Sequence, residues 1–288
     1  HALIDAGALV TGLSNREVAE HLLGAGLGHV DGVLFYDEED EALLATRADD
    51  GSVVVLDNAN ACPPGRRFTF YDHAHCTGLD VKQRVDCAAA LTLSKDTTLR
   101  DAAQAAFRLR RLGRGQRVRL FLIPEVAGCV AEATRTTTPR VRELLGSDGA
   151  WAAGGLRLVL AWLAVNGIRR ERVNFFVLAE QNVQNVARKV AHAELVAKSV
   201  DVGNVKAGAG AEWLRSCLDV FRTRVDFTVE NAVPTPAPCS ERIAAIIEDH
   251  ADLMTDAPDF GTAQRMLQQV TAAEEASRRA KTRAEDRQ

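Results

Sequence analysis

Short apolar runs recur through the first 130 residues and alternate with segments of helical spacing. Each run is bounded by residues such as Gly, Pro, Asp or Asn, as strands are. The runs are Gly32–Asp37, Ser52–Leu56, Arg67–Tyr71, Ala88–Leu93 and Val118–Ile123. Continuous apolar runs suit strands that are buried on both faces of a sheet. Because helical segments separate them, the pattern predicts an α/β fold with a largely parallel sheet.

Capping residues predict two helices between these strands. Ser14 precedes the amphipathic segment Asn15–Leu23, and Glu17 stands three residues after Ser14, where a capping box needs it. A second helix is expected over Thr98–Arg110, with Asp96 or Thr97 as its cap.

From residue 131 onward, helical spacing replaces the strand pattern. The helical segments are Pro139–Leu145, Gly154–Asn166, Val183–Val200, Ala211–Val225, Ser240–Met254 and Thr262–Arg283. Only Arg172–Leu178 fits either a strand or a helix. Three prolines mark a linker near residues 233–239: Pro234, Pro236 and Pro238. We therefore predict two domains, 1–130 and 131–288, the second a helical extension.

The composition excludes a disordered chain, because 47% of the residues are hydrophobic and the net charge is only −4. Apolar runs such as Leu156–Ala164 are far shorter than the roughly 18–20 residues that cross a bilayer, so no membrane contact is expected. Six cysteines without regular spacing indicate a reducing compartment. No signal-peptide pattern is present, so we expect a cytoplasmic or nuclear protein. The chain begins at His1 rather than Met, and we expect it to be part of a longer protein.

Charge is distributed unevenly. Residues 1–72 hold 13 acidic and 4 basic residues, a net of −9, whereas residues 100–119 hold seven arginines and one aspartate, a net of +6. A local concentration of arginine predicts a phosphate or carboxylate site. The alternative is that some of these arginines pair with the acidic first segment.

The segment from Thr77 to Gln116 carries the strongest set of candidate residues. Thr77, Gly78 and Asp80 form a turn after an apolar strand, and glycine allows a close approach to a ligand. On a helix, Gln104 and Arg108 share one face and Arg111 lies close to it. Together they suit recognition of a polyphosphate, because arginine offers a fixed fork of donors.

This segment resembles the last two motifs of superfamily 2 helicases, which lie on the second RecA-like lobe. The usual pattern, Gln-x-x-Gly-Arg-x-Gly-Arg, places Gln104, Arg108 and Arg111 on the Gln and the two Arg positions. Phe107 and Arg110 stand where the pattern has glycine, and a second register puts Arg114 in the arginine-finger position. The resemblance implies that these arginines face a nucleotide and that Thr77, Gly78 and Asp80 line the cleft between two lobes.

A closer resemblance covers about residues 1–128. It rests on His1–Asn15, on Val33–Asp37, on the Arg67–Gln83 segment with its Thr-Gly-x-Asp turn, and on Ala90–Gln104. These segments are similar to a family of very large eukaryotic proteins built of domains of unknown function. The family has a helicase-like region and is catalogued as cysteine-type ubiquitinyl hydrolases.

The family resemblance implies further partners. A phosphate-binding loop lies upstream in such proteins, and no Gly-x-x-x-x-Gly-Lys-Ser/Thr occurs in this chain. We therefore expect no cofactor in the chain itself, and ATP with Mg²⁺ only in the longer protein. The expected partners are an upstream first RecA-like lobe and ubiquitin or a ubiquitinated protein. Aromatic residues make up only 5%, which gives nucleic-acid binding little support.

Cys76 and His75 are the candidates for thiol chemistry, which needs a thiolate and a nearby base. The alternative is that Cys76 is a plain small residue and that His75 hydrogen-bonds the turn at Thr77–Asp80. No Cys-x-x-Cys or His-x-x-x-His pair is present, so we predict no metal site. The acidic run Asp37–Glu41 predicts an exposed hairpin or loop tip.

Two functions remain open from the sequence. In the first, the chain is a helicase-like, nucleotide-dependent lobe of a protein that hydrolyses ubiquitin conjugates, and the segment alone is inactive. In the second, the lobe is a degenerate scaffold that binds a protein partner without chemistry. The departures from the helicase pattern at Phe107 and Arg110 favour the second.

Overall fold

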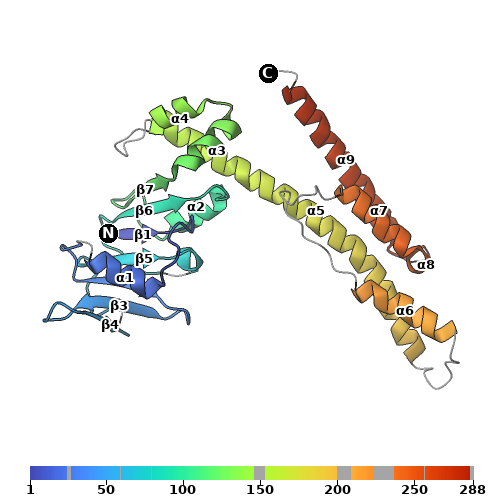
Figure 1. Cartoon of the computed structure of the whole chain (residues 1–288), viewed down its shortest axis with the longest axis horizontal. Coiled ribbons are helices and arrows are strands. Elements are labelled where there is room, and N and C mark those ends of the chain that lie inside the picture. Colours follow the sequence, from blue (N-terminus) through green and yellow to red (C-terminus); the bar gives the residue numbers. More distant parts are fainter. Residues whose placement is uncertain are drawn as a thin grey trace. The chain divides into compact units, whose positions relative to one another are not determined.

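The computed structural model describes residues 1–24, 27–58, 60–78, 80–145, 153–199, 209–222, 237–255 and 257–285. Its contacts divide the chain into two compact units, unit 1 (His1–Arg169) and unit 2 (Arg170–Gln288). Figure 1 traces both units along the sequence.

Unit 1 is built on a seven-stranded mixed sheet of order β4-β3-β2-β5-β1-β6-β7. The strands are β1 Ala2–Ile4, β2 Gly32–Tyr36, β3 Ala42–Arg47, β4 Val53–Leu56, β5 Arg67–Tyr71, β6 Ala88–Leu93 and β7 Arg117–Leu122. The five strands β2, β5, β1, β6 and β7 run parallel, and β3 and β4 extend one edge as antiparallel hairpins. The predicted α/β class with a largely parallel sheet is confirmed.

All five predicted strands are present, and two strands were not anticipated. Strand β1 has only three residues, yet it lies between β5 and β6 in the parallel part of the sheet. Strand β3 directly follows the acidic run Asp37–Glu41, which forms the tip of the β2–β3 hairpin as predicted.

Helices cover both faces of the sheet. On one face, α1 (Asn15–Gly24) packs Val18, Ala19 and Leu23 against β2, β3 and β5. Ser14 and Glu17 form the predicted capping box, because the Glu17 carboxylate accepts the Ser14 N–H at 2.7 Å and the Ser14 Oγ accepts the Glu17 N–H. The helices on the other face are α2 (Leu99–Ala106), α3 (Pro124–Thr134), α4 (Thr138–Leu145) and the beginning of α5 (Ala153–Ser199).

Helix α2 is shorter than predicted and begins at a different cap. Thr98, rather than Asp96 or Thr97, caps it in a capping box with Asp101. The helix ends at Ala106, because the backbone at Phe107 (φ −73°, ψ 2°) leaves the helical range and its N–H bonds back to Ala103 and Ala105. Residues 107–116 form turns instead of a further helical turn.

The two units part between Arg169 and Arg170, later than the expected boundary near residue 130. Helices α3, α4 and the first part of α5 belong to unit 1 because their apolar faces, including the fully buried Trp162, join the core of the sheet. Asn166 of α5 also donates to the carbonyls of Lys95 and Thr97, at 3.0 and 2.9 Å. The ambiguous segment Arg172–Leu178 is part of α5.

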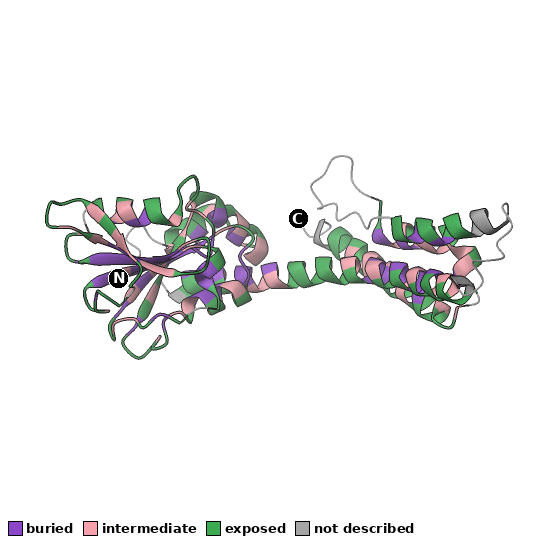
Figure 2. Cartoon of the chain, turned by 90° about the horizontal axis from the view of Figure 1, so that it is seen from below, coloured by how far each residue is buried: buried purple, intermediate pink, exposed green. Residues whose placement is uncertain are grey.

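In unit 2 the described residues form helices and turns: α5 continues to Ser199, followed by α6 (Ala209–Arg222), α7 (Cys239–Asp249), α8 (Ala251–Met254) and α9 (Phe260–Glu285). Their apolar faces make a separate core, seen as buried positions in Figure 2. At this core the half-buried Arg242 of α7 donates two hydrogen bonds to the Glu180 carboxylate of α5, at 2.8 and 3.0 Å. Pro238 precedes α7, whereas Pro234 and Pro236 lie outside the described residues. Across the described ranges, no helix is both long enough and apolar enough to cross a bilayer.

Candidate functional site

The carboxyl ends of the parallel strands bring polar residues to one edge of the sheet. Asp5 follows β1, Asp72 and His75 follow β5, Ser94 follows β6, and Asp40 lies in the turn after β2. In open α/β sheets, ligands usually bind outside this edge. The edge is therefore the first candidate site.

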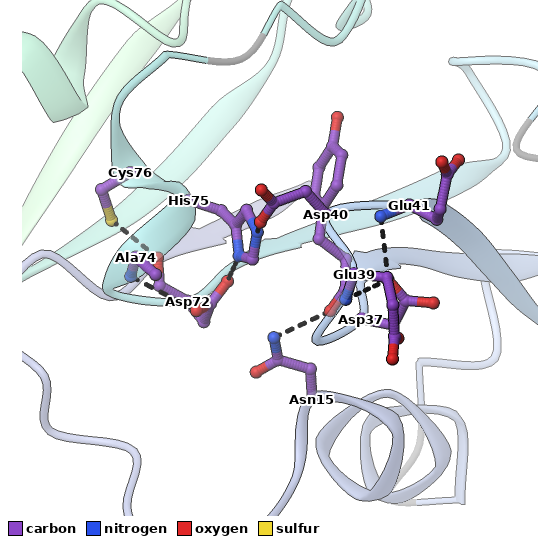
Figure 3. Close-up of polar contacts among 10 residues, drawn as sticks. Asn15, Asp37, Glu39, Asp40, Glu41, Asp72, Ala74, His75 and Cys76 are labelled. Carbon is purple, nitrogen blue, oxygen red and sulfur yellow. Dashed lines mark hydrogen bonds and ion pairs between the residues drawn. The ribbon is translucent and has the colours of Figure 1, made fainter.

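His75 lies between two carboxylates from different segments (Figure 3). Its Nδ1 atom contacts the Asp72 carboxylate, and its Nε2 atom lies 2.9 Å from Oδ1 of Asp40. The imidazole also stacks on Tyr36, with ring centroids 5.0 Å apart and planes 18° apart. His75 is buried, whereas the side chain of Asp40 is 83% exposed. His75 therefore ties the tip of the β2–β3 hairpin to the segment that follows β5.

The surroundings of His75 favour its charged form. Burial lowers the pKa of His75, but hydrogen bonds to Asp40 and Asp72 and the charges of both carboxylates outweigh burial and raise the pKa above its ordinary value of 6.5. Each ring nitrogen faces a carboxylate. The imidazole is thus arranged to hold a positive charge and is not directed at a thiol.

Cys76 does not have the surroundings of a nucleophile. Its Sγ donates to the main-chain carbonyl of Asp72 at 3.1 Å. Burial, together with the charges of Asp5 and Asp72, raises the pKa of the Cys76 thiol to about 12. The reactive species in thiol chemistry is the thiolate, so a thiol that stays protonated at neutral pH does not support this role. The geometry does not bring Cys76 and His75 together as a nucleophile and its base.

The turn after η1 (Ala74–Cys76) leaves Thr77 and Gly78 exposed. Gly78 has a φ of +83°, which only glycine adopts at little cost. The alternative in which His75 hydrogen-bonds this turn is wrong, because both ring nitrogens of the imidazole contact Asp72 and Asp40 instead. The sheet order explains this difference, since β2 and β5 are neighbours and their carboxyl ends lie side by side.

The crevice between β1 and β6 is filled by the chain itself. Strand β1 leads to β2 and strand β6 leads to β7, on opposite sides, which makes this the switch point of the sheet. The Asp5 carboxylate accepts two N–H groups of the following loop, at 3.0 and 2.9 Å, and the Thr92 hydroxyl at 2.6 Å. A Cβ on Gly7 would lie 2.8 Å from the nitrogen of Ser94, so this loop lies directly against the end of β6. The polar groups at the switch point therefore hold the fold.

A groove of about 500 Å³ lies beside the hairpin tip, between the tip and the first turn of α1. Asn15 fixes its wall by donating to the carbonyl of Tyr36 at 2.8 Å. Its lining carries three carboxylates, from Asp37, Glu38 and Glu39, and one cation, Arg16, which is paired with Glu20 at 3.0 Å. Such a lining repels phosphates, so this end of the sheet does not suit an anionic ligand.

The predicted arginine motif is not on one helix. Because α2 ends at Ala106, Gln104 lies on the helix whereas Arg108 and Arg111 lie in the turns that follow. The expectation that Gln104, Arg108 and Arg111 share a helix face is therefore wrong. Gln104, Arg111 and Arg114 are all exposed.

Arg108 is half-buried and lies near the aromatic residues of the site. Its charge opposes the rise in pKa that burial causes at Tyr36, Tyr71 and Cys76, and the pKa of Tyr71 is raised to about 12. The charge of Arg108 is thus felt by buried side chains of the core, whereas Arg111 and Arg114 are exposed to solvent.

Asp80 and Arg110 join the two halves of the predicted motif. The Arg110 Nε atom lies 3.0 Å from Oδ1 of Asp80, and both side chains are exposed. Asp80 lies outside residues 1–72, so this ion pair is not the pairing with the acidic first segment that was the alternative for the arginine cluster. The pair therefore places Asp80 next to the turns at residues 107–116. Arg110, which makes this contact, stands where the helicase pattern has glycine.

A buried glutamine holds the turn at residues 107–116, here called the arginine turn. The Gln116 side chain accepts the N–H of Arg111 at 2.7 Å and donates to the carbonyl of Arg84 at 2.8 Å. Gly115 has a φ of +108°, and a Cβ there would lie 2.7 Å from the carbonyl oxygen of Val85. Since residues 84–87 precede β6 and the turn precedes β7, the arginine turn lies at the amino edge of the sheet.

Sequence reasoning missed Asp40, Tyr36 and Gln116. The acidic run predicted an exposed tip, but which histidine Asp40 meets depends on the order of the strands. Gln116 follows Gly-Arg-Gly directly, and these glycines were the local sign that residues 113–115 form a turn.

The described residues contain no group of three or more His, Cys, Asp or Glu that could hold a metal ion. Comparisons with protein-family models, curated proteins and solved structures found no match. The likeness to helicases and to the ubiquitinyl hydrolase family is therefore carried by the motifs alone.

Proposed function

We propose that residues 1–169 are a RecA-like lobe of the second-lobe type, from a helicase-like, nucleotide-dependent protein. In this proposal Arg111 and Arg114 contact the phosphates of a nucleotide that the first lobe presents. The seven-stranded sheet, with five parallel strands and helices on both faces, is compatible with such a lobe.

The arginine turn carries the proposal. Its backbone is held by Gln116 and by glycines in the left-handed region, and Arg111 and Arg114 point outward from it. Because the backbone of the turn is already fixed, the arginines can bind phosphate without a rearrangement of the turn. Preorganised arginines stabilise the charge on a transferring phosphoryl group in this way. In this proposal the nucleotide comes with the first lobe, since the carboxylates at the carboxyl edge repel its phosphates.

We assign no hydrolysis of ubiquitin conjugates to Cys76 and His75. A probe made of ubiquitin with an electrophilic carboxyl end is expected to leave Cys76 unlabelled, and labelling of Cys76 in the folded chain would contradict this assignment.

A non-catalytic scaffold is the second candidate, and one observation favours it. Phe107, where the helicase pattern has glycine, is 57% exposed at the end of α2. A large exposed aromatic residue beside an arginine turn is a common feature of protein interfaces.

The test is a titration of the chain with sodium tripolyphosphate, and separately with Mg·ATP, followed by the NMR signals of the arginine side chains. We expect the signals of Arg111 and Arg114 to shift and the double variant R111A/R114A to bind tripolyphosphate about tenfold more weakly. The matched control R142A/R157A removes two exposed arginines from α4 and α5 and is expected to bind as the unchanged chain does. Equal losses in both variants, or no shift at Arg111 and Arg114, would leave only non-specific charge and refute the proposal.

A further inference from the structure

Strand β7 is the last strand of the sheet and has a neighbour on one side. Its register with β6 runs from Ala88–Arg117 to Leu93–Leu122, the full length of both strands. Within the part of the chain that the structure describes, no strand pairs with its outer side. The outer side therefore offers main-chain N–H and C=O groups to a further strand.

The two faces of β7 differ in burial. Val118, Leu120 and Leu122 are half-buried against the core of unit 1. The alternating residues Arg117, Arg119 and Phe121 are exposed on the other face, Phe121 to 57%. Two arginines and an uncovered aromatic ring thus follow one another along an open edge, about 6.6 Å apart at 3.3 Å per residue.

The β6 residues next to the exposed residues of β7 have small side chains. The register places Ala88, Ala90 and Thr92 of β6 beside Arg117, Arg119 and Phe121. Helix α1 packs on the same face but over β2, β3 and β5. Figure 1 shows it in front of the sheet, away from β7. The small side chains of β6 therefore leave Arg117, Arg119 and Phe121 uncovered on the inner side, in keeping with their exposure.

We propose that β7 is a docking edge for an extended acidic segment of a partner protein, which adds to the sheet as a further strand. Its backbone pairs with the outer side of β7, and alternate carboxylates meet Arg117 and Arg119. An apolar side chain of the segment covers Phe121. This inference does not rest on nucleotide binding at the arginine turn.

Charge and chemistry argue against other occupants. A second copy of β7 in antiparallel pairing would bring arginines close to arginines, which is destabilising. A nucleic-acid strand has no backbone that completes a sheet edge, and Phe121 alone gives it a single stacking surface on this face. An acidic peptide satisfies the main-chain groups and the two arginines together.

The test uses a blocked peptide of about eight residues in which Glu alternates with Val, the length of a short strand. We expect it to shift the amide signals of β7 in the NMR spectrum of the chain and to slow hydrogen exchange of its outward-pointing amides. The charge-reversed variant R117E/R119E is expected to bind about tenfold more weakly and to prefer a peptide in which Lys replaces Glu.

The matched control is R142E/R157E, which changes the net charge equally at two exposed helical positions and is expected to bind the Glu peptide as the unchanged chain does. Phe121→Ser tests the apolar contact separately and is expected to weaken binding without the change in charge preference. The proposal is overturned if the Glu peptide does not bind at millimolar concentration or leaves the β7 amides unshifted. It is equally overturned if both charge reversals act alike, or if single-stranded oligothymidylate binds these arginines while the peptide does not.

Discussion

Replacing Asp40 by asparagine tests the bridge between His75 and the hairpin tip. The substitution removes one negative charge from the Nε2 side of His75 and keeps a side chain of the same shape. Asp40 has a φ of +62°, and asparagine is among the residues that accept this left-handed backbone best. The exchange therefore changes charge with little added strain.

The expected effect depends on pH with a definite sign. The pKa of His75 is raised in the folded chain, so its imidazolium adds stability that is fully present below the ordinary value of 6.5 and is lost as pH rises through the folded pKa. Exposed ion pairs contribute about 0.2–1 kcal/mol. Because His75 is buried although Asp40 is exposed, we expect Asp40→Asn to cost about 1 kcal/mol near pH 5.5 and close to nothing near pH 9.

The measurement has two parts. The pKa of His75 is read from its imidazole NMR signals, and Asp40→Asn is expected to lower it. Urea unfolding followed by amide signals of unit 1 gives the free energy at both pH values. Glu39→Gln is the control, because Glu39 is on the same tip and its carboxylate is not bonded to His75. Equal drops in the pKa of His75 in both variants, or a loss of stability as large near pH 9 as near pH 5.5, would refute the bridge.

Three further outcomes follow from the site. With iodoacetamide the folded chain is expected to react at the half-buried Cys129 well before Cys76, whose pKa is raised to about 12; mass spectrometry of the peptides shows the order, and faster alkylation of Cys76 would contradict it. Gly7→Ala is expected to cost about 1–3 kcal/mol of unfolding free energy, because its Cβ meets backbone, whereas Gly28→Ala, in open space, costs less; equal costs would refute the close approach. Gln116→Ala is expected to cost about 2 kcal/mol by the loss of two hydrogen bonds, and a cost below that of one bond would show that the turn does not depend on it.

The sequence predicted the part of the fold that depends on local signals. Apolar runs located five strands, and Ser14 with Glu17 located the start of α1, because both signals lie within a few residues of each other. Strand β1 escaped because three residues are too few for a pattern, although neighbours on both sides hold it in the sheet. The end of α2 escaped because Gln104–Arg111 is compatible with a helix in composition, and the turn is stabilised by Gln116, which lies after it.

The candidate site was predictable only where its partners are close in sequence. Asp72 and His75 lie three residues apart and could be proposed together, whereas Asp40 lies 35 residues from His75 and reaches it through the pairing of β2 with β5. The count of charges located the arginine cluster in the sequence, and the phosphate or carboxylate site expected there stays a prediction. The count did not separate Arg108, which acts on buried tyrosines, from Arg111 and Arg114, which face solvent.

The two ends of the parallel strands differ in charge and in what their polar groups do. At the carboxyl edge, Asp5, Asp72 and His75 are bonded within the protein and the hairpin tip adds further carboxylates. At the amino edge the arginine turn exposes Arg111 and Arg114 to solvent, and the Gln116 side chain already hydrogen-bonds the backbone of the turn. A sheet of this class usually binds ligands at the carboxyl edge. In this chain electrostatics opposes that rule for an anion, so a phosphate or carboxylate ligand is expected at the arginine turn or along β7.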